Sequence, residues 1–498
     1  MMKISGNLTA NKGRSEGKIV FVNGLAMLLF LVFTPLILAT DYHIGPNQTF
    51  TTISAAPWAS LQAGDKVFIH WQSAAYHEKW VINAQGTINA PIAIIGVSNS
   101  NGDKPIIDGN NAVTATGLNY WNENRGVIKI GGSNIPNDAM PSYIIIENLA
   151  IRSARPPYEF SDDNNTTQSY INNAASIYVE KAQHLIIRNC EIFDSGNGIF
   201  IAANGGQTQD ILIEKNHIFD NGNVGRIFEH NTYSAAIGVI YQFNHFGPLR
   251  TGALGNNLKD RSAGLVVRYN WIESGNRQLD LVDAEDSQVL VNHPSYHETF
   301  VYGNILIEPD GAGNSQIIHY GGDSGTFADY RKGTLYLYNN TIISTRSGNT
   351  TLLRLSSTDE SAEVFNNIIY TTASGNTMAM IDDDGTVNLQ YNWLKTNWQN
   401  CHCTPTGSVN NLGNNIVGSQ PLFVNFNNQD FHLQDNSSAI DNAKTLPPQV
   451  VPNNVISQQY WQHQKAAPRP VVNQIDIGAY ENCGTLGCDL IFANGFEG

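Results

Sequence analysis

Short apolar runs interrupted by one asparagine recur along most of this chain. The phrases are LIIRNCEIF, ILIEKNHIF, YQFNHF, LVVRYNWI, FVYGNILI, LYLYNNTII, EVFNNIIY and LQYNWL. Aligned on that asparagine, they give Asn189, Asn216, Asn244, Asn270, Asn304, Asn340, Asn367 and Asn392, with gaps of 27, 28, 26, 34, 36, 27 and 25 residues. An apolar β run, a turn residue and a second β run, repeated at this period, predict a solenoid.

Three short strands and about 25 residues per turn are typical of a parallel β-helix. We therefore predict an all-β, right-handed parallel β-helix with an N-terminal capping helix. Asn suits the turn because it tolerates the left-handed backbone conformation, and stacked coils can align the Asn amides in a ladder. The two long gaps predict loops around 293–298 and 315–331, and loops on a rigid scaffold often carry function.

The pattern divides the chain into five segments. Residues 1–40 are predicted to be a signal peptide, because several Lys and Arg residues precede an apolar run that ends at the small residue Ala39. An uncleaved membrane anchor is the alternative. We predict a cap and first coils over 41–142, regular coils over 143–398, an irregular closing segment over 399–482 and a tail over 483–498. No later segment is apolar enough to span a membrane, so we expect a bacterial protein that is secreted or held at the cell surface.

Composition and charge narrow the choice of partner. Only 14% of the 498 residues are charged, 44 are glycine, and the formal net charge is −15. No basic run or stripe is present, which argues against nucleic acid as a partner. An acidic polymer would have to meet a local basic cluster or bound cations. We expect the mature chain to be a monomer without a membrane span.

The five cysteines suggest different roles. Cys483 and Cys488 are spaced to close a small disulfide loop in an oxidising compartment. Cys401 and Cys403 are too close together for an easy mutual disulfide. With the intervening His they offer part of a metal-ligand set, but the second ligand pair of a structural zinc site is absent. Cys190 is predicted to be a buried free thiol.

One strand position collects titratable side chains over successive coils. Alignment on the Gly-Asn turns places GNGIFIA (196–202), EHNTYSA (229–235), GNNLKDRSA (255–263) and GNRQLDLVDAED (275–286) at that position, and QIIHYGG follows. Because stacked strands lie about 4.8 Å apart, such a column lines a groove suited to a linear polymer. After the first, apolar coil, the column contains His230, Tyr233, Lys259, Arg261, Asp280, Asp283 and His319.

The stretch HNTY…NNLKDRSAGLVVRYNWIESGNRQLDLVD resembles secreted bacterial β-helix proteins of the pectate lyase superfamily, many of which degrade polysaccharides. Lys259 followed by Arg268-Tyr269-Asn270 is similar to polysaccharide lyase family 6, the group of alginate lyases and chondroitinase B. Val282 stands where that family has an Arg, so the resemblance carries over only Lys259. It implies a polysaccharide lyase that acts on an acidic, uronate-containing glycan.

Cleavage of such a glycan by β-elimination needs a neutralised sugar carboxylate, a base for the carbon-bound proton and a proton for the leaving oxygen. We predict Lys259 as the base, Arg261 as the neutralising group, and His230 and Tyr233 as proton donors. His319 is a further candidate catalytic residue. Clustered carboxylates are the ligands that Ca²⁺ prefers, and a Ca²⁺ site is predicted from three of them, Asp280, Asp283 and Glu285.

Other interpretations stay open. The basic residues at 259–261 also fit a solvated ion-pair cluster, and the acidic residues at 280–286 an exposed edge. A glycoside hydrolase would need paired carboxylates, and the Gly-His-Gly phrase typical of polygalacturonases is absent. A non-catalytic, adhesin-like glycan-binding surface protein would show aromatic platforms along one face. An enzyme would instead bring His230, Lys259 and Arg261 together over a cleft, within about 10 Å.

Overall fold

The computed structural model describes residues 39–372 and 377–484. The predicted signal peptide lies outside the described residues apart from its last two positions, and so does Cys488. None of the described helices is long and apolar enough to cross a membrane.

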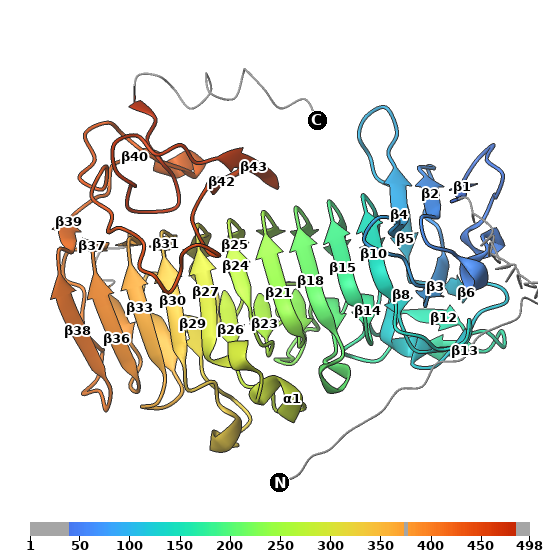
Figure 1. Ribbon diagram of the computed structural model, residues 1–498, viewed down its shortest axis with the longest axis horizontal. Helices are drawn as coiled ribbons and strands as arrows, with labels where there is room; N and C mark the ends of the chain where they lie inside the picture. Colours follow the sequence, from blue (N-terminus) through green and yellow to red (C-terminus); the bar gives the residue numbers. More distant parts are fainter. Residues whose placement is uncertain (1–38, 373–376, 485–498) are drawn as a thin grey trace, which may run out of the picture. The chain divides into compact units, whose positions relative to one another are not determined.

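The described chain winds through three long sheets whose strands stack coil upon coil (Figure 1). Sheet 1 contains, in spatial order, β1 (Asp41–Ile44), β2 (Lys66–His70), β4 (Ile92–Val97), β10 (Ser142–Glu147), β15 (Gln183–Arg188), β18 (Gln209–Glu214), β21 (Ile237–Gln242), β24 (Val266–Arg268), β27 (Glu298–Tyr302), β30 (Thr334–Tyr338), β33 (Ser361–Phe365), β36 (Thr386–Gln390) and β38 (Ser408–Gly413).

Sheet 2 contains the short strands that follow the asparagine turns. In spatial order they are β39 (Ile416–Gly418), β37 (Trp393–Lys395), β34 (Ile368–Thr371), β31 (Thr341–Ser344), β28 (Ile305–Glu308), β25 (Trp271–Glu273), β22 (His245–Phe246), β19 (His217–Ile218), β16 (Glu191–Phe193), β11 (Ala150–Arg152) and β5 (Ile106–Asp108).

Sheet 3 carries the predicted column of titratable residues. Its strands are β13 (Thr167–Ser169), β12 (Glu159–Ser161), β6 (Ala112–Thr114), β3 (Glu78–Ile82), β8 (Gly126–Ile130), β14 (Ala175–Val179), β17 (Asn197–Ile201), β20 (Thr232–Ser234), β23 (Leu258–Asp260), β26 (Leu279–Leu281), β29 (Gln316–Tyr320), β32 (Thr350–Leu355) and β35 (Met378–Ile381). Strands of successive coils pair in parallel, which confirms the right-handed parallel β-helix.

The core forms because alternate residues of each strand point inward. In β15, Leu185 and Ile187 are fully buried, and they lie in register with Ile211 and Ile213 of the next coil. Repetition of this contact stacks aliphatic side chains along the inside of the helix and removes their surface from water. The predicted capping helix corresponds to two short 3₁₀ turns, η1 (Ile53–Ala55) and η2 (Trp58–Ser60), and Trp58 of η2 stacks on Trp80 of β3.

The asparagine ladder is present from the coil of Asn216 onward. Each side-chain Nδ2 donates to Oδ1 of the next Asn at 2.9–3.1 Å, through Asn216, Asn244, Asn270, Asn304, Asn340, Asn367, Asn392 and Asn415. The residue that adopts positive φ is the one before each ladder residue, for example Lys215 and Tyr269, at +55° in both cases. The sequence alignment was therefore wrong by one position in the first coil. There Asn189 takes the left-handed place (φ 51°), and the backbone N–H of Cys190 donates to Asn216.

Both long gaps contain inserted segments, as predicted. The first insert carries α1 (Gln288–Val291) and η5 (Pro294–His297) between β26 and β27. The second runs from the end of β29 to β30, carries η6 (Phe327–Asp329), and starts later than expected because residues 316–320 are strand. Shorter turns and hairpins complete the described elements: η3 (Glu123–Arg125), η4 (Asn204–Gly206), η7 (Phe426–Asn428), β7 (Asn119–Tyr120), β9 (Ser133–Ile135), β40 (Phe423–Asn425), β41 (Asp430–Leu433), β42 (Gln458–Trp461) and β43 (Lys465–Pro468).

The closing segment after Gly418 packs on the outer face of sheet 2, where Figure 1 shows β40, β42 and β43. Phe431 stacks on Trp271 of β25, with ring centroids 5.5 Å apart. Arg469, whose side chain is fully buried, donates to the carbonyl oxygens of Asp476 and Tyr480, which fixes the turn formed by residues 476–481.

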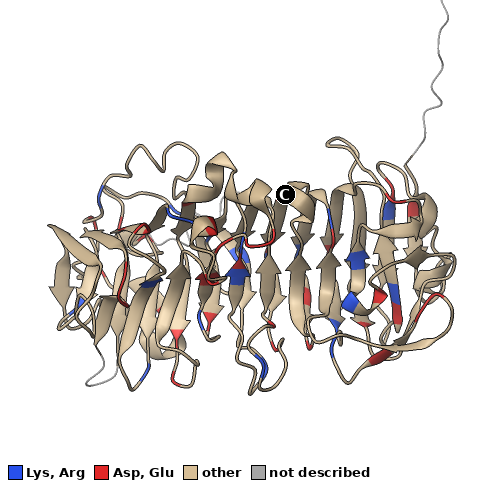
Figure 2. Cartoon of the chain, turned by 90° about the horizontal axis from the view of Figure 1, so that it is seen from below, with Lys and Arg blue, Asp and Glu red and all other residues tan. Residues whose placement is uncertain are grey.

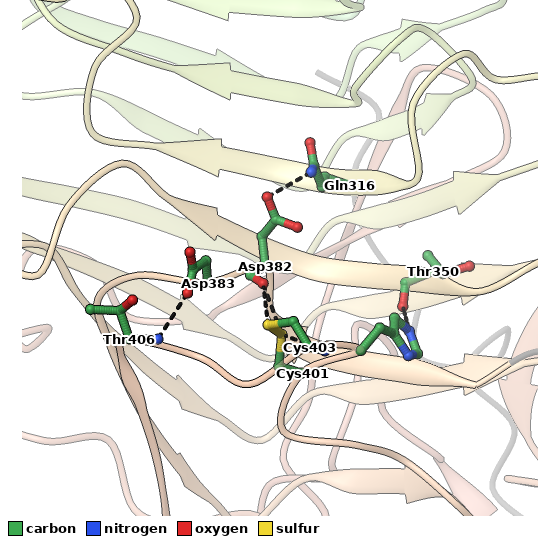
Figure 3. The surroundings of a disulfide bond; sticks show 8 residues. Gln316, Thr350, Asp382, Asp383, Cys401, Cys403 and Thr406 are labelled. Carbon is green, nitrogen blue, oxygen red and sulfur yellow. Dashed lines mark hydrogen bonds between the residues drawn. A yellow bond between two sulfur atoms is a disulfide. The ribbon is translucent and has the colours of Figure 1, made fainter.

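Cys401 and Cys403 form a disulfide, contrary to the sequence expectation (Figure 3). The backbone turns at the intervening residue and holds the two Cα atoms 5.1 Å apart, within the usual range for a disulfide. The two sulfurs are therefore not available as metal ligands. Cys190 is a buried free thiol, as predicted, and burial raises its pKa to about 12. Cys483 is also disulfide-bonded.

Candidate functional site

Strand register builds one continuous row of polar side chains on sheet 3. Tyr233 pairs with Lys259, Lys259 with Asp280, Asp280 with His319, and His319 with Arg354 of β32. These residues follow Phe200 of β17, as expected from the sequence alignment. Figure 2 shows basic and acidic residues on neighbouring strands near the middle of the stack.

The row lines a groove with a volume of about 1010 Å³. All five predicted catalytic residues line this one groove: His230, Tyr233, Lys259, Arg261 and His319. Its length follows the stacking of coils from Asn197 of β17 to Arg354 of β32. Neighbouring strands lie about 4.8 Å apart, so the groove extends over more than 20 Å, enough for a linear polymer rather than a single small molecule.

At the centre of the groove a carboxylate is held by two cations. Asp323 Oδ2 lies 2.5 Å from Lys259 Nζ, and Asp323 Oδ1 lies 2.9 Å from Arg261 Nη2. We call Lys259 and Arg261 the cation pair. Both cations are buried, whereas the side chain of Asp323 is 30% exposed. Asp323 belongs to the insert after β29. Sequence reasoning missed Asp323, although its Gly-Gly-Asp-Ser-Gly context lies within a predicted loop.

Lys259 is an ammonium in this arrangement. Its Nζ donates to Asp280 Oδ2 at 2.8 Å as well as to Asp323. Burial opposes the charged form, but the carboxylates of Asp280 and Asp323 outweigh it and raise the pKa of Lys259. Burial likewise opposes ionisation of Asp280, yet Lys259 and His319 hold its pKa well below the usual range.

Arg261 connects the cation pair to Tyr233. Its Nε donates to the Tyr233 hydroxyl at 2.7 Å, and its Nη2 also lies 2.7 Å from Glu285 Oε1. The Tyr233 ring stacks on Phe200, with centroids 4.9 Å apart and planes 9° apart. Burial raises the pKa of Tyr233 although the Arg261 guanidinium opposes this, so the phenol keeps its proton at neutral pH.

His230 and His319 are neutral, and their hydrogen bonds fix the position of the proton. His230 Nδ1 accepts from the backbone N–H of Asn256 at 2.9 Å, so the ring proton lies on Nε2. Burial, helped by the charge of Lys259, lowers the pKa of His230 to about 3. Burial also lowers the pKa of His319, against the opposing effect of the Asp280 carboxylate.

The three carboxylates predicted to bind Ca²⁺ do not converge on a metal site. Asp280 accepts from Lys259, Asp283 Oδ1 accepts from the backbone N–H of Asp323 at 2.8 Å, and Glu285 pairs with Arg261. In the described part of the chain no group of three or more His, Cys, Asp or Glu residues is placed to hold a metal ion. We therefore derive no chemical step through Ca²⁺.

No protein-family model and no curated protein matches the sequence. Similar solved structures include pectate lyase Pel9A, with 11% identity, 89% of this chain and 96% of that chain covered, and a TM-score of 0.48. An alginate lyase from Paenibacillus sp. str. FPU-7 has 14% identity, coverages of 71% and 95%, and a TM-score of 0.42. The GH136 lacto-N-biosidase from Eubacterium ramulus has 11% identity, coverages of 76% and 68%, and a TM-score of 0.37. At this level of similarity, the function has to be inferred from the residues of the chain itself.

Proposed function

We propose that this protein is an exported polysaccharide lyase, which binds a uronate residue of an acidic glycan at the cation pair and cleaves the chain by β-elimination. The observation that carries this proposal is the position of the Asp323 carboxylate, which contacts both members of the cation pair. Asp323 shows that a carboxylate can bind the guanidinium of Arg261 with Lys259 directly beside it, as a uronate undergoing elimination would require. Neutralising that carboxylate stabilises the carbanion-like transition state formed when the adjacent carbon loses its proton.

In this mechanism the sugar carboxylate replaces Asp323 on Arg261. Attraction to Asp323 is one of the causes that raise the pKa of Lys259, so loss of this contact lowers that pKa. Lys259 can then release one proton to solvent, and as the free amine it takes the carbon-bound proton. Tyr233 is protonated and held by Arg261, and it donates a proton to the leaving oxygen. The Nε2–H of His230 supplies a further hydrogen bond in the groove.

Two arginines away from the centre fit a polyanionic substrate. Arg354 is exposed and lies on the same row, three strands beyond Lys259 and thus about 14 Å away. Arg125 lies towards the other end, where its guanidinium covers the rings of Tyr178 and Phe200. Among the described residues neither arginine forms an ion pair closer than 4 Å with a carboxylate. Both are therefore available to additional sugar carboxylates.

Glycoside hydrolysis is a second candidate, favoured by one observation. Glu285 Oε1 and Asp323 Oδ1 both contact Arg261 Nη2, at 2.7 and 2.9 Å, so the two carboxylates lie close together. Burial raises the pKa of Glu285, whereas Lys259 and Arg261 lower the pKa of Asp323 against the effect of its burial. Neighbouring carboxyl groups with pKa values pushed in opposite directions are what a retaining hydrolase uses.

The proposal is tested by following the ultraviolet absorbance of unsaturated uronate while the full chain acts on pectate, alginate, chondroitin or hyaluronan. We expect a signal on one polymer and a loss of about 10²–10⁴-fold in Lys259→Met and in Arg261→Gln. The matched control is Arg268→Gln, on sheet 1 outside the groove. A chelator added to the same assay tests whether the reaction needs Ca²⁺. Full activity in both groove variants would contradict the proposal.

A further inference from the structure

Asp280, His319 and Ser356 form a hydrogen-bonded chain beside the cation pair. His319 Nδ1 lies 2.8 Å from Asp280 Oδ1, and His319 Nε2 lies 2.8 Å from Ser356 Oγ. Asp280 and His319 occupy paired positions on β26 and β29, and Ser356 directly follows β32. Since alternate residues of a strand share a face, Ser356 lies on the same side as Arg354, which pairs with His319.

The donors and acceptors of this chain can be assigned. An ionised carboxylate only accepts, so the proton of neutral His319 lies on Nδ1 and points to Asp280. His319 Nε2 is then an acceptor at 2.8 Å from the hydroxyl of Ser356, whose proton has the carbonyl oxygen of Gly322, also at 2.8 Å, as a second acceptor. This is the proton arrangement of an Asp–His–Ser triad, in which the neutral imidazole takes the serine proton and the buried carboxylate stabilises the imidazolium. The order Asp, His, Ser along the chain also occurs among serine hydrolases.

The side chains of the Asp280–His319–Ser356 hydrogen-bonded chain become more exposed towards the serine. Asp280 and His319 are each 2% exposed, whereas Ser356 is only partly buried. Gly321, at φ +134°, lets the backbone approach Ser356 closely, because a Cβ there would lie 2.6 Å from Ser356 Oγ. The backbone N–H of Gly322 donates to Ser356 Oγ at 2.8 Å. This contact helps to fix the position of Ser356 Oγ beside His319.

We propose that Ser356 is the nucleophile of a serine esterase that removes O-acyl groups from the glycan in the groove. Ser356 Oγ attacks the acyl carbonyl carbon, and its proton passes to His319 Nε2. The bond from the carbonyl to the sugar oxygen then breaks, and that oxygen takes the proton from His319. Water, deprotonated by His319, attacks the acyl-serine; the carboxylic acid is released, and Ser356 Oγ takes the proton back from His319.

The class of substrate follows from the residue that the two sites share. Asp280 accepts from His319 through Oδ1 and from Lys259 through Oδ2, so the triad and the cation pair share one carboxylate, and Asp280 and His319 line the same groove as the cation pair. The acyl-bearing sugar would therefore belong to the same chain as the bound uronate. The ester chemistry is independent of the proposed lyase, but the choice of an acylated acidic glycan rests on that proposed function.

The test combines covalent labelling with ester hydrolysis by the full chain. A fluorophosphonate probe should label Ser356, located by mass spectrometry of the modified peptide, and p-nitrophenyl acetate should be hydrolysed. Ser356→Ala should abolish labelling and lower hydrolysis by about 10³-fold or more. The matched control Ser357→Ala should keep both, because the Ser357 hydroxyl contacts Glu360 and not His319.

Acetate release from O-acetylated pectate and O-acetylated alginate is measured on the same samples. Release by the wild type and not by Ser356→Ala supports the whole proposal. An unlabelled Ser356 in wild-type protein, or equal ester hydrolysis by wild type and Ser356→Ala, overturns it. Labelling and p-nitrophenyl acetate hydrolysis without acetate release overturn the glycan assignment alone. Failure of the lyase proposal would appear separately, as the absence of unsaturated uronate.

Discussion

Replacing Asp323 with Asn should strengthen the binding of uronate oligosaccharides. In the structure the Asp323 carboxylate occupies the position where the sugar carboxylate is proposed to bind, so the substrate has to displace it from Lys259 and Arg261. An amide of the same size is neutral and competes poorly for both cations. The substitution keeps the shape of the groove and removes the internal competitor.

The size of the effect follows from the two contacts. Hydrogen bonds to charged groups contribute about 1.5–3 kcal/mol each, and partial exposure of Asp323, with 30% of its side chain in solvent, screens them. A combined competition of about 2 kcal/mol corresponds to a 10–30-fold lower Kd in Asp323→Asn. The same lost contacts should lower the free energy of unfolding by about 1–2 kcal/mol.

The assay measures Kd by isothermal titration calorimetry with trigalacturonate and trimannuronate, trisaccharides that contain no unsaturated uronate. The control is Asp286→Asn, because Asp286 lines the groove and is exposed, but among the described residues it forms no ion pair with the cation pair. Its Kd should change less than threefold. The pKa of Asp323 is depressed, so its interaction is present above its unfolded value and lost as pH falls through the lower folded value. The variant effect should therefore be constant from pH 5 to pH 8. A Kd in Asp323→Asn equal to or higher than that of the wild type would refute the reasoning.

Three further outcomes are expected. Asn270→Ala should lower the free energy of unfolding in urea by about 3–5 kcal/mol, because it leaves several buried ladder groups without partners. Asn189→Ala, at an exposed position, should lower it by under about 1 kcal/mol, and equal losses in the two variants would contradict the role given to the ladder. Tyr233→Phe should reduce the lyase rate by about 10²-fold or more while the Kd for trigalacturonate stays within a few-fold, so an unchanged rate would exclude Tyr233 as the acid. Burial lowers the pKa of His217 to about 3, so its contribution to stability should be full above pH 6.5 and be lost as pH falls towards 3. His217→Phe should reduce the dependence of the free energy of urea unfolding on pH in this range, and an unchanged dependence would show that His217 is not its cause.

The repeat made much of the fold predictable, because one turn residue recurs at each coil and strand spacing is constant. The same logic placed Tyr233, Lys259, Asp280 and His319 in one row, as their register shows. It failed by one residue at Asn189, where Cys190 takes the ladder position: an Asn also fits the left-handed place, so the two positions look alike in sequence.

The residues that escaped prediction come from segments outside the repeat. Asp323 lies on an insert whose backbone follows glycine conformations and local hydrogen bonds, so its distance to Lys259 cannot be read from spacing. Ser356 follows a strand end, and only the register of β32 brings it to His319. Cys401 and Cys403 pair because the chain turns sharply between them, a conformation that their separation alone did not indicate.

The central claim is that the cation pair binds a uronate so that the glycan is cleaved by elimination, and mass spectrometry of the products tests it most directly. The full chain is incubated in ¹⁸O-labelled water with the polymer that it cleaves. The account predicts oligosaccharides with an unsaturated uronate at the new non-reducing end and no ¹⁸O gained in cleavage. Saturated products that carry one ¹⁸O at the new reducing end would contradict it, and would identify a hydrolase built on Glu285 and Asp323.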